Sequence, residues 1–417
     1  MTTEFQNLNE VLMHNFVKSR DAIALDYTKD SRSERNTYRQ LSHQVYTIVN
    51  YLMTDGIAAD DRVVVWMPNS PEQIWVDLGA TLSGGIITPL AMETETPDAV
   101  WVINDLQAKY VFVATKTQLD ALVALRSQLK SVRKVIVLEE IELEDEWMVP
   151  FYWMINFPTQ INALGNVHLI RDNKTAASPL CILYPLLPEG KIQRRGVVFT
   201  HGNCLSAIRS IGNRLGFDEE TGKNIKRYPV MHTFNDIYER MMGFYLILYY
   251  GKTMVIAEPI AARSVQAQWE ITEADFTCLP AEYYESLCSH LTMGMTESSF
   301  SNWTLENGLR IAELQLDGNP IGWFLRKKHD FYKSQRETLK RKNAKTVKFF
   351  ISYGNALQES TAKFFYAMDW KIVQSFGTIE TFGFATIDNL NAPQPLTAGM
   401  SLAGLEIQIE KYGPVLV

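Results

Sequence analysis

Apolar positions recur with two periods over residues 1–135, which predicts helices and strands that follow one another. Residues 38–53 repeat apolar positions at helical spacing, and Asp55-Gly56 supplies a helix stop. The run RVVVWMP that begins at Arg62 is short, β-branched and bounded by turn residues, as is typical of a buried strand. Strands separated by helices predict a parallel, doubly wound sheet. The further predicted elements are a helix over 71–83 and strands over 86–90, 110–115 and 134–139.

Residues 139–157 interrupt this pattern with an acidic stretch and then an aromatic one. Residues 139–146, EEIELEDE, hold six acids, and WMVPFYWMINF follows at once. We interpret the segment as a solvated acidic loop followed by a packed lid. The alternative is a contact with a protein partner or a membrane through 139–157.

Residues 326–348 are strongly basic, with ten Lys/Arg against two acids. The apolar residues in and beside this segment fall at roughly helical spacing, which predicts a solvated basic helix. The alternative is a surface for anionic lipid, a polyphosphate cofactor or a protein partner. These apolar residues are Phe324, Leu325, Phe331, Tyr332 and Leu339.

Composition and charge place the chain among ordinary globular proteins. Of its 417 residues 46% are hydrophobic and 21% charged, and this length suits two or three fused lobes. The net charge of −7 provides no global positive field, which argues against a dedicated nucleic-acid binder.

Four sparse cysteines without CxxC spacing predict reduced, buried thiols rather than a disulfide framework or a metal site. The N-terminus lacks the pattern of a signal peptide, and the longest apolar stretch, 241–250, ends at Gly251-Lys252. We therefore expect a cytoplasmic protein, with peripheral membrane association as the one alternative.

Five blocks, in order along the chain, carry a family resemblance: TYRQLSHQVYTIVNYLMTDGIAADDRVVVWMPNSPEQIWVDLGATLSGGIITPL (37–90), GVVFTHGN (196–203), HTFNDIYERMMGFYLILYYG (232–251), ISYGNALQESTAKFFYAMDWKIVQSFGTIETFG (351–383) and LTAGMSLAGLEIQI (396–409). Together they resemble the large domain of adenylate-forming enzymes of the acyl-CoA synthetase type, within the long-chain fatty acid branch. The resemblance covers nearly the whole chain in register.

This resemblance implies an α/β fold with two doubly wound α/β lobes and a smaller β-rich lobe, over approximately 1–180, 181–385 and 386–417. It also implies a reaction, in which ATP and a carboxylate give an acyl-adenylate and pyrophosphate before a thiol, usually CoA, takes the acyl group. The family continues into a small domain with a catalytic lysine, which the resemblance implies is absent from this chain. We therefore assign no intact catalytic residue.

The phosphate-binding loop departs most from the family pattern Tyr-Thr-Ser-Gly-Thr-Thr-Gly-x-Pro-Lys-Gly. Here the stretch is YPLLPEGKIQRRG, residues 184–196, without a single hydroxyl between its ends. Its prolines remove N–H donors, and Glu189 would repel a triphosphate. Arg194 offers one positive charge, and Arg195 falls at the position of the family lysine. The remnant of the loop is Gly190, Lys191, Arg195 and Gly196.

The nucleotide pocket is better preserved. Gly354, Asn355 and Ala356 stand where the family lines the purine, although a strand-to-helix turn could need the glycine alone. In Ser375-Phe376-Gly377-Thr378-Ile379-Glu380, Phe376 can stack on a base, and Glu380 matches the family's Mg²⁺-binding carboxylate. Ile379 replaces the family threonine. We expect a strand-like backbone here, in which Thr378 would point to the opposite face and an α-phosphate contact would be missing.

The segment expected to line the acyl tunnel contains His232, Phe234 and Tyr238. The family spacing His-x-Phe-Glu-Arg is expanded here to HTFNDIYER, and a core histidine is the alternative role for His232. His201 fits the Thr-His that follows the phosphate loop in the family.

Three functions remain open from the sequence. The favoured one is a degenerate homologue, impaired in activating carboxylates, that binds an acyl chain, a nucleotide or a partner and needs no cofactor. The second is a divergent but active long-chain fatty acid–CoA ligase that uses ATP, Mg²⁺ and CoA. The third is a scaffold subunit that uses 139–157 as its interface.

Overall fold

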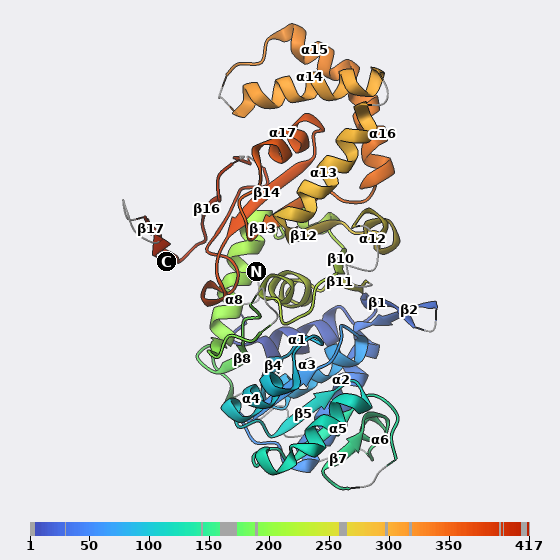
Figure 1. The fold of residues 1–417 in the computed structure, drawn as a ribbon, viewed down its shortest axis with the longest axis vertical. Coiled ribbons are helices and arrows are strands. Elements are labelled where there is room, and N and C mark those ends of the chain that lie inside the picture. Colours follow the sequence, from blue (N-terminus) through green and yellow to red (C-terminus); the bar gives the residue numbers. More distant parts are fainter. Residues whose placement is uncertain are drawn as a thin grey trace. The chain divides into compact units, whose positions relative to one another are not determined.

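The computed structural model describes residues 5–29, 31–142, 145–158, 173–187, 191–257, 265–296, 299–316, 319–391, 393–394, 396–409 and 415–416. These residues form two compact units, and Figure 1 shows their helices and strands. Unit 1 comprises residues 1–208 and 232–256, and unit 2 comprises 209–231 and 257–417. The three lobes with limits at 180 and 385 stay a prediction.

Unit 1 is built on a seven-stranded sheet in the order β7-β6-β5-β3-β4-β8-β9. All neighbours are parallel except β8 and β9, so the predicted parallel, doubly wound arrangement is confirmed. The strands are β3 (Arg62–Trp66), β4 (Ile86–Pro89), β5 (Tyr110–Val113), β6 (Lys134–Val137), β7 (Met148–Pro150), β8 (Pro179–Leu183) and β9 (Val197–Thr200). The intervening helices are α2 (Tyr38–Asp55), α3 (Pro71–Leu82), α4 (Thr96–Leu106) and α5 (Lys116–Ala124), the last followed by the short η1 (Arg126–Gln128).

The helix boundaries follow from local signals in the sequence. Thr37 forms a capping box with Gln40 at the start of α2, and Gly56, at φ +85°, ends that helix in the left-handed conformation. Ser70 caps α3, and Pro71 occupies its first turn, where a missing N–H costs nothing. The helices predicted over 38–53 and 71–83 are therefore confirmed with nearly the expected limits.

The lid predicted within 139–157 is wrong. Residues 148–150 form the edge strand β7 beside β6, and α6 (Phe151–Ile155) follows it directly. Trp147 and Phe151 are buried, whereas Tyr152 and Trp153 are exposed. Phe151 and Met154 lie three residues apart on the buried side of α6, and Tyr152 and Trp153 lie on its exposed side, so helical spacing decides which of these aromatic side chains are covered.

The rest of unit 1 includes a second, smaller sheet and an unusual helix. In this sheet β1 (Ile23–Lys29) pairs with β2 (Arg32–Thr37) and with β11 (Thr253–Ile256). A continuous helical stretch consists of α10 (Ile237–Glu239), the π-helix η2 (Arg240–Leu246) and α11 (Ile247–Tyr249). Helix α1 (Leu8–Lys18) begins the unit, and α8 (His201–Leu215) runs on into the residues of unit 2.

Unit 2 contains a five-stranded mixed sheet in the order β12-β13-β14-β15-β16. The first three strands are parallel, and β15 and β16 are antiparallel. The strands of this sheet are β12 (Phe276–Pro280), β13 (Phe349–Tyr353), β14 (Lys371–Phe376), β15 (Thr386–Ile387) and β16 (Met400–Ser401). Strand β10 (Arg227–Val230) precedes them in the chain, and β17 (Gln408–Ile409) and β18 (Val415–Leu416) form a separate antiparallel pair. The helices are α9 (Glu220–Asn224), α12 (Val265–Thr272), α13 (Ala281–Thr296), α14 (Ser299–Leu316), α15 (Trp323–Phe331), α16 (Lys333–Asn343) and α17 (Glu359–Ala367). The α/β class with two α/β sheets and additional small β structure is confirmed.

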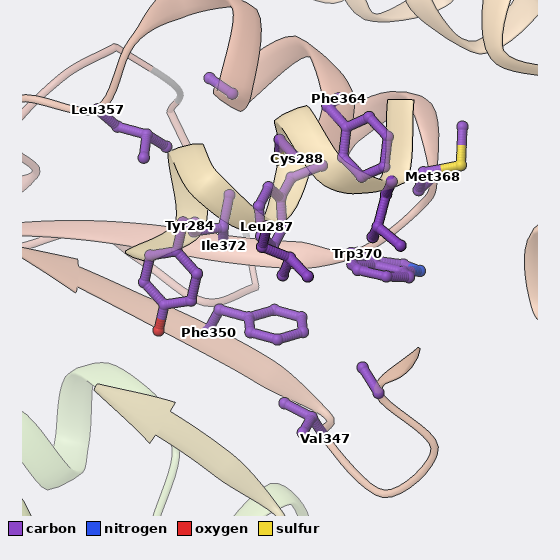
Figure 2. Packing of buried hydrophobic residues seen from close by; sticks show 14 of the residues in the cluster. Tyr284, Leu287, Cys288, Val347, Phe350, Leu357, Phe364, Met368, Trp370 and Ile372 are labelled. Carbon is purple, nitrogen blue, oxygen red and sulfur yellow. The ribbon is translucent and has the colours of Figure 1, made fainter. Parts of the chain in front are cut away.

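An aromatic cluster fixes the strands of unit 2 beneath their helices (Figure 2). Phe350 of β13 stacks on Trp370 with ring centroids 5.8 Å apart. The hydroxyl of Tyr284 on α13 donates to the backbone oxygen of Ile351 at 3.0 Å. These contacts hold β13 against α13 and against the residue that directly precedes β14 (Lys371–Phe376).

The described residues include no helix long and apolar enough to cross a membrane. The apolar stretch 241–250 lies instead mostly within the buried π-helical segment of unit 1. The four cysteines are buried free thiols, as predicted.

Candidate functional site

The predicted nucleotide residues come together at one edge of the sheet in unit 2. Strands β13 and β14 are parallel neighbours with Ser352 opposite Gln374, so residues 354–356 and 376–380 follow their carboxyl ends side by side. In open α/β sheets this edge is where ligands bind. Gly354, Asn355 and Ala356 are exposed, and Phe376 is half-buried.

Two features of this edge have structural explanations of their own. Gly354 has φ +80°, and a Cβ added there would meet nothing within 4 Å, so the turn after β13 needs glycine for its conformation alone. Ser375 is buried and its hydroxyl donates to the backbone oxygen of Ser352 at 3.1 Å, which links the two strands. Asn355, Ala356 and Phe376 are therefore the residues left to contact a purine.

The strand-like backbone expected after Phe376 is wrong. Strand β14 ends at Phe376, and the short 3₁₀ helix η4 (Ile379–Thr381) follows. The Thr378 N–H donates to the Thr381 hydroxyl at 2.9 Å, and that hydroxyl donates to the Thr378 carbonyl at 3.0 Å. A strand's alternation of faces therefore does not apply to Thr378 and Ile379. Tight turn chemistry, not a period of two, decides where these side chains point.

Gly377 is held where another residue cannot fit. A Cβ added there would lie 2.2 Å from the backbone oxygen of Gly383, an atom that cannot move aside without deforming the turn. We expect Gly377→Ala to lower the free energy of unfolding by about 1–3 kcal/mol, measured by urea denaturation. Gly322→Ala is the matched control, because a Cβ at Gly322 meets nothing within 4 Å. Equal losses in the two variants would contradict this packing argument.

Glu380, the candidate Mg²⁺ ligand, is exposed in the middle of η4. Among the described residues no group of three or more His, Cys, Asp or Glu side chains could hold a metal ion. Glu380 therefore fits only the type of Mg²⁺ site in which one carboxylate is joined by phosphate oxygens and water.

The phosphate-loop remnant forms a β-hairpin in unit 1. Leu186 and Ile192 form an antiparallel bridge, the Leu187 N–H donates to the Lys191 carbonyl at 2.8 Å, and the Gln193 N–H donates to the Pro185 carbonyl at 2.8 Å. Gly190 lies outside the described residues. Lys191 and Arg195 are exposed beside the hairpin, whereas Gly196 packs closely against Tyr184 and Ile182.

Two side chains of α4, Asp98 and Trp101, contact this hairpin. Ile192 is buried, and its N–H donates to the Asp98 carboxylate at 3.2 Å. The Arg194 guanidinium lies 4.0 Å from Asp98 and 5.3 Å from the centre of the Trp101 ring. No local pattern pointed to Asp98 or Trp101, because both contact residues that lie about ninety positions further along the chain.

The three acyl-binding candidates lie in a buried part of unit 1. Phe234 and Tyr238 are buried, and His232 is half-buried. The His232 N–H donates to the Glu239 carboxylate at 3.0 Å, and Asn69 donates to the His232 carbonyl at 2.5 Å. Sequence reasoning did not single out Asn69 as a contact of this segment.

A buried ion pair follows this segment directly. Arg240, fully buried, donates to the Asp77 carboxylate of α3 at 2.9 and 3.2 Å and to the Tyr245 hydroxyl at 3.0 Å. Its guanidinium also lies 5.5 Å from the centre of the Phe244 ring. Burial raises the pKa of the Asp77 carboxyl, and the Arg240 charge acts in the opposite direction. The pair joins the π-helix η2 to α3.

A family model described as AMP-binding enzyme matches residues 12–184 and 193–413. The unmatched residues 185–192 coincide with the hairpin. Between residues 12 and 413, this is the one stretch that the family model leaves unmatched.

Two curated proteins illustrate the similarity. The chain is 22% identical over 376 residues to the human long-chain-fatty-acid–CoA ligase ACSBG1, covering 87% of this chain and 50% of that protein. It is 23% identical over 198 residues to the medium-chain fatty-acid–CoA ligase of Escherichia coli (strain K12), covering 45% of this chain and 32% of that protein. The chain therefore spans at most about half the length of these relatives.

Solved structures share the fold at low sequence identity. The N-terminal domain of FACL13 from Mycobacterium tuberculosis aligns with a TM-score of 0.67 and 17% identity over 99% of this chain and 87% of that one. The anthranilate CoA ligase AuaEII, in complex with anthranoyl-AMP, aligns with a TM-score of 0.70 and 14% identity over 99% of this chain and 67% of that one.

Proposed function

Because the chain belongs to the AMP-binding enzyme family, we propose that it binds an adenylate or acyl ligand while being impaired in ATP-dependent activation of a carboxylate. The observation that carries this proposal is the hairpin between Tyr184 and Arg194, which α4 fastens through Asp98.

The hairpin lacks what a triphosphate needs. The Leu187 and Gln193 N–H groups already donate to carbonyls of the hairpin itself, and the Ile192 N–H donates to Asp98. Residues 185–195 contain no Ser or Thr hydroxyl. Backbone N–H groups directed at phosphate oxygens are the usual source of phosphate binding in such loops, so a hairpin that uses its own donors gives little β,γ-phosphate affinity.

The nucleotide edge in unit 2 supports retained binding of the adenylate part. Asn355 and Ala356 are exposed, and half-buried Phe376 ends the neighbouring strand, so its aromatic ring is the candidate on which a purine would stack. The carboxylate is expected to be a fatty acid, since two relatives carry fatty-acid–CoA ligase names. CoA, ATP and Mg²⁺ are substrates and cofactor only if activation survives.

Calorimetric titration of the whole chain with AMP, Mg-ATP and a non-hydrolysable long-chain acyl-adenylate analogue tests this proposal. We expect the analogue and AMP to bind, and ATP to bind no more than about threefold more tightly than AMP, since the β,γ-phosphates lack donors. Phe376→Ala is expected to weaken binding of AMP about tenfold through lost stacking. Phe331→Ala, which removes an exposed aromatic ring elsewhere in unit 2, is the control.

Two results would count against this proposal. If none of the three ligands gives a heat signal with a sample that unfolds cooperatively, the proposed binding of an adenylate or acyl ligand is contradicted. ATP binding at least about tenfold tighter than AMP binding, with carboxylate-dependent exchange of pyrophosphate into ATP, would instead establish the divergent active ligase.

A further inference from the structure

The outer face of α15 exposes three large aromatic side chains. Trp323, Phe324 and Phe331 are 70%, 75% and 72% exposed. Phe324 and Phe331 are seven residues apart, which places them on the same side of the helix. Figure 1 shows α15 beyond α14, on the side of unit 2 away from its strands. Side chains of this size are seldom left in water together without a partner.

Lysines accompany these rings. Lys327 and Lys328 are exposed on the turn between Phe324 and Phe331, and the Lys327 ammonium lies 4.9 Å from the centre of the Trp323 ring. Residues 326–348 carry ten Lys/Arg against two acids in a chain whose net charge is −7. Arg326, Lys327 and Lys328 belong to α15 itself, against the single acid Asp330, so α15 carries a local positive charge that favours an anionic surface.

The opposite side of α15 is fixed to unit 2. His329 lies 3.2 Å from the Asp369 carboxylate, and the buried Arg336 of α16 donates to the same carboxylate at 2.8 Å. Tyr332, at the end of α15, is buried. These contacts fix the orientation of α15 about its own axis, so its exposed aromatic side chains cannot turn toward the interior of unit 2. The basic segment is thus two helices that meet at Tyr332, not the single helix predicted.

We propose that the outer face of α15 docks on an anionic lipid bilayer. Trp323 and Phe324, at the start of α15, are side chains of the kind that lie at the boundary between lipid headgroups and acyl chains. The long side chains of the lysines can keep their ammonium groups among anionic headgroups. An acidic protein surface could pair with the lysines, but it would offer no apolar environment for the three exposed aromatic rings. This inference is independent of nucleotide binding.

Flotation of the whole chain with lipid vesicles tests it. We expect binding to vesicles of phosphatidylcholine mixed with phosphatidylglycerol, weaker binding in high salt, and none to phosphatidylcholine alone. Lys327→Gln/Lys328→Gln is expected to reduce partitioning about thirtyfold, from two lost headgroup interactions. Lys29→Gln/Lys130→Gln, with the same change of charge at exposed positions of unit 1, is the control.

Phe324→Ser/Phe331→Ser is expected to reduce partitioning at least about tenfold, because two buried rings are lost from the bilayer boundary. All these side chains are exposed, so the urea midpoint should stay unchanged and confirm folding. Equal losses in the control pair, or no binding to anionic vesicles, would overturn the proposal. Retention on immobilised polyglutamate without vesicle binding would assign the face to an acidic protein instead.

Discussion

Arg240→Met is expected to lower the free energy of unfolding by about 3–5 kcal/mol, measured by urea denaturation at neutral pH. Methionine fills much of the same volume but leaves the Asp77 carboxylate, almost fully buried in α3, without its cation. An uncompensated charge in a region of low dielectric costs several kcal/mol. Burial already raises the pKa of Asp77, so the variant should lose less stability at low pH, where that carboxyl accepts a proton.

The double variant Asp77→Leu/Arg240→Met separates the charge effect from packing. Replacing a whole buried ion pair by apolar residues of similar volume is often neutral, so we expect it to recover most of the lost stability. Arg39→Met is a control, because Arg39 makes an exposed ion pair with Asp21 and should change stability by less than about 1 kcal/mol. A double variant as unstable as Arg240→Met would show that Arg240 stabilises the fold through its packing and not by neutralising the Asp77 carboxylate.

The sheet of unit 1 could be predicted because its signals are local. Buried β-branched runs such as residues 62–66, a capping box at Thr37 and a left-handed glycine at Gly56 each specify structure within a few residues. The π-helix at 240–246 could not be predicted, because an apolar run has no periodicity that separates it from an ordinary buried helix.

The segments of the candidate site stay a prediction from the sequence, and the way in which these segments fold could not be predicted. The hairpin depends on Asp98, and the ion pair joins Asp77 to Arg240 across 163 positions. No spacing rule links residues so far apart. After Thr378, whose own backbone is extended, the prediction failed for a local reason: the Thr381 hydroxyl bonds back to Thr378, and the chain turns into 3₁₀ geometry at Ile379.

His201 is the group through which unit 1 should be sensitive to acid. Its ring is buried, and its Nδ1 accepts a hydrogen bond from the Leu8 N–H of α1 at 3.1 Å. Burial, followed by the nearby Lys174 charge, lowers the pKa of His201 from 6.5 to about 4. In the unfolded chain the ring takes up a proton near its ordinary pKa, whereas in the folded chain it stays neutral until about pH 4.

The free energy of unfolding is therefore expected to fall as the pH drops from about 6.5 to about 4, with about 3 kcal/mol of that loss due to His201. His201→Asn is the matched variant, since its amide oxygen can accept the Leu8 N–H in the place of Nδ1 but cannot be protonated. Carboxylates titrate in both proteins, so the difference between their two pH profiles, from urea denaturation, isolates the imidazole. Profiles that run parallel from pH 7 to pH 4 would mean that His201 is protonated equally in the folded and unfolded chain, contrary to its buried position.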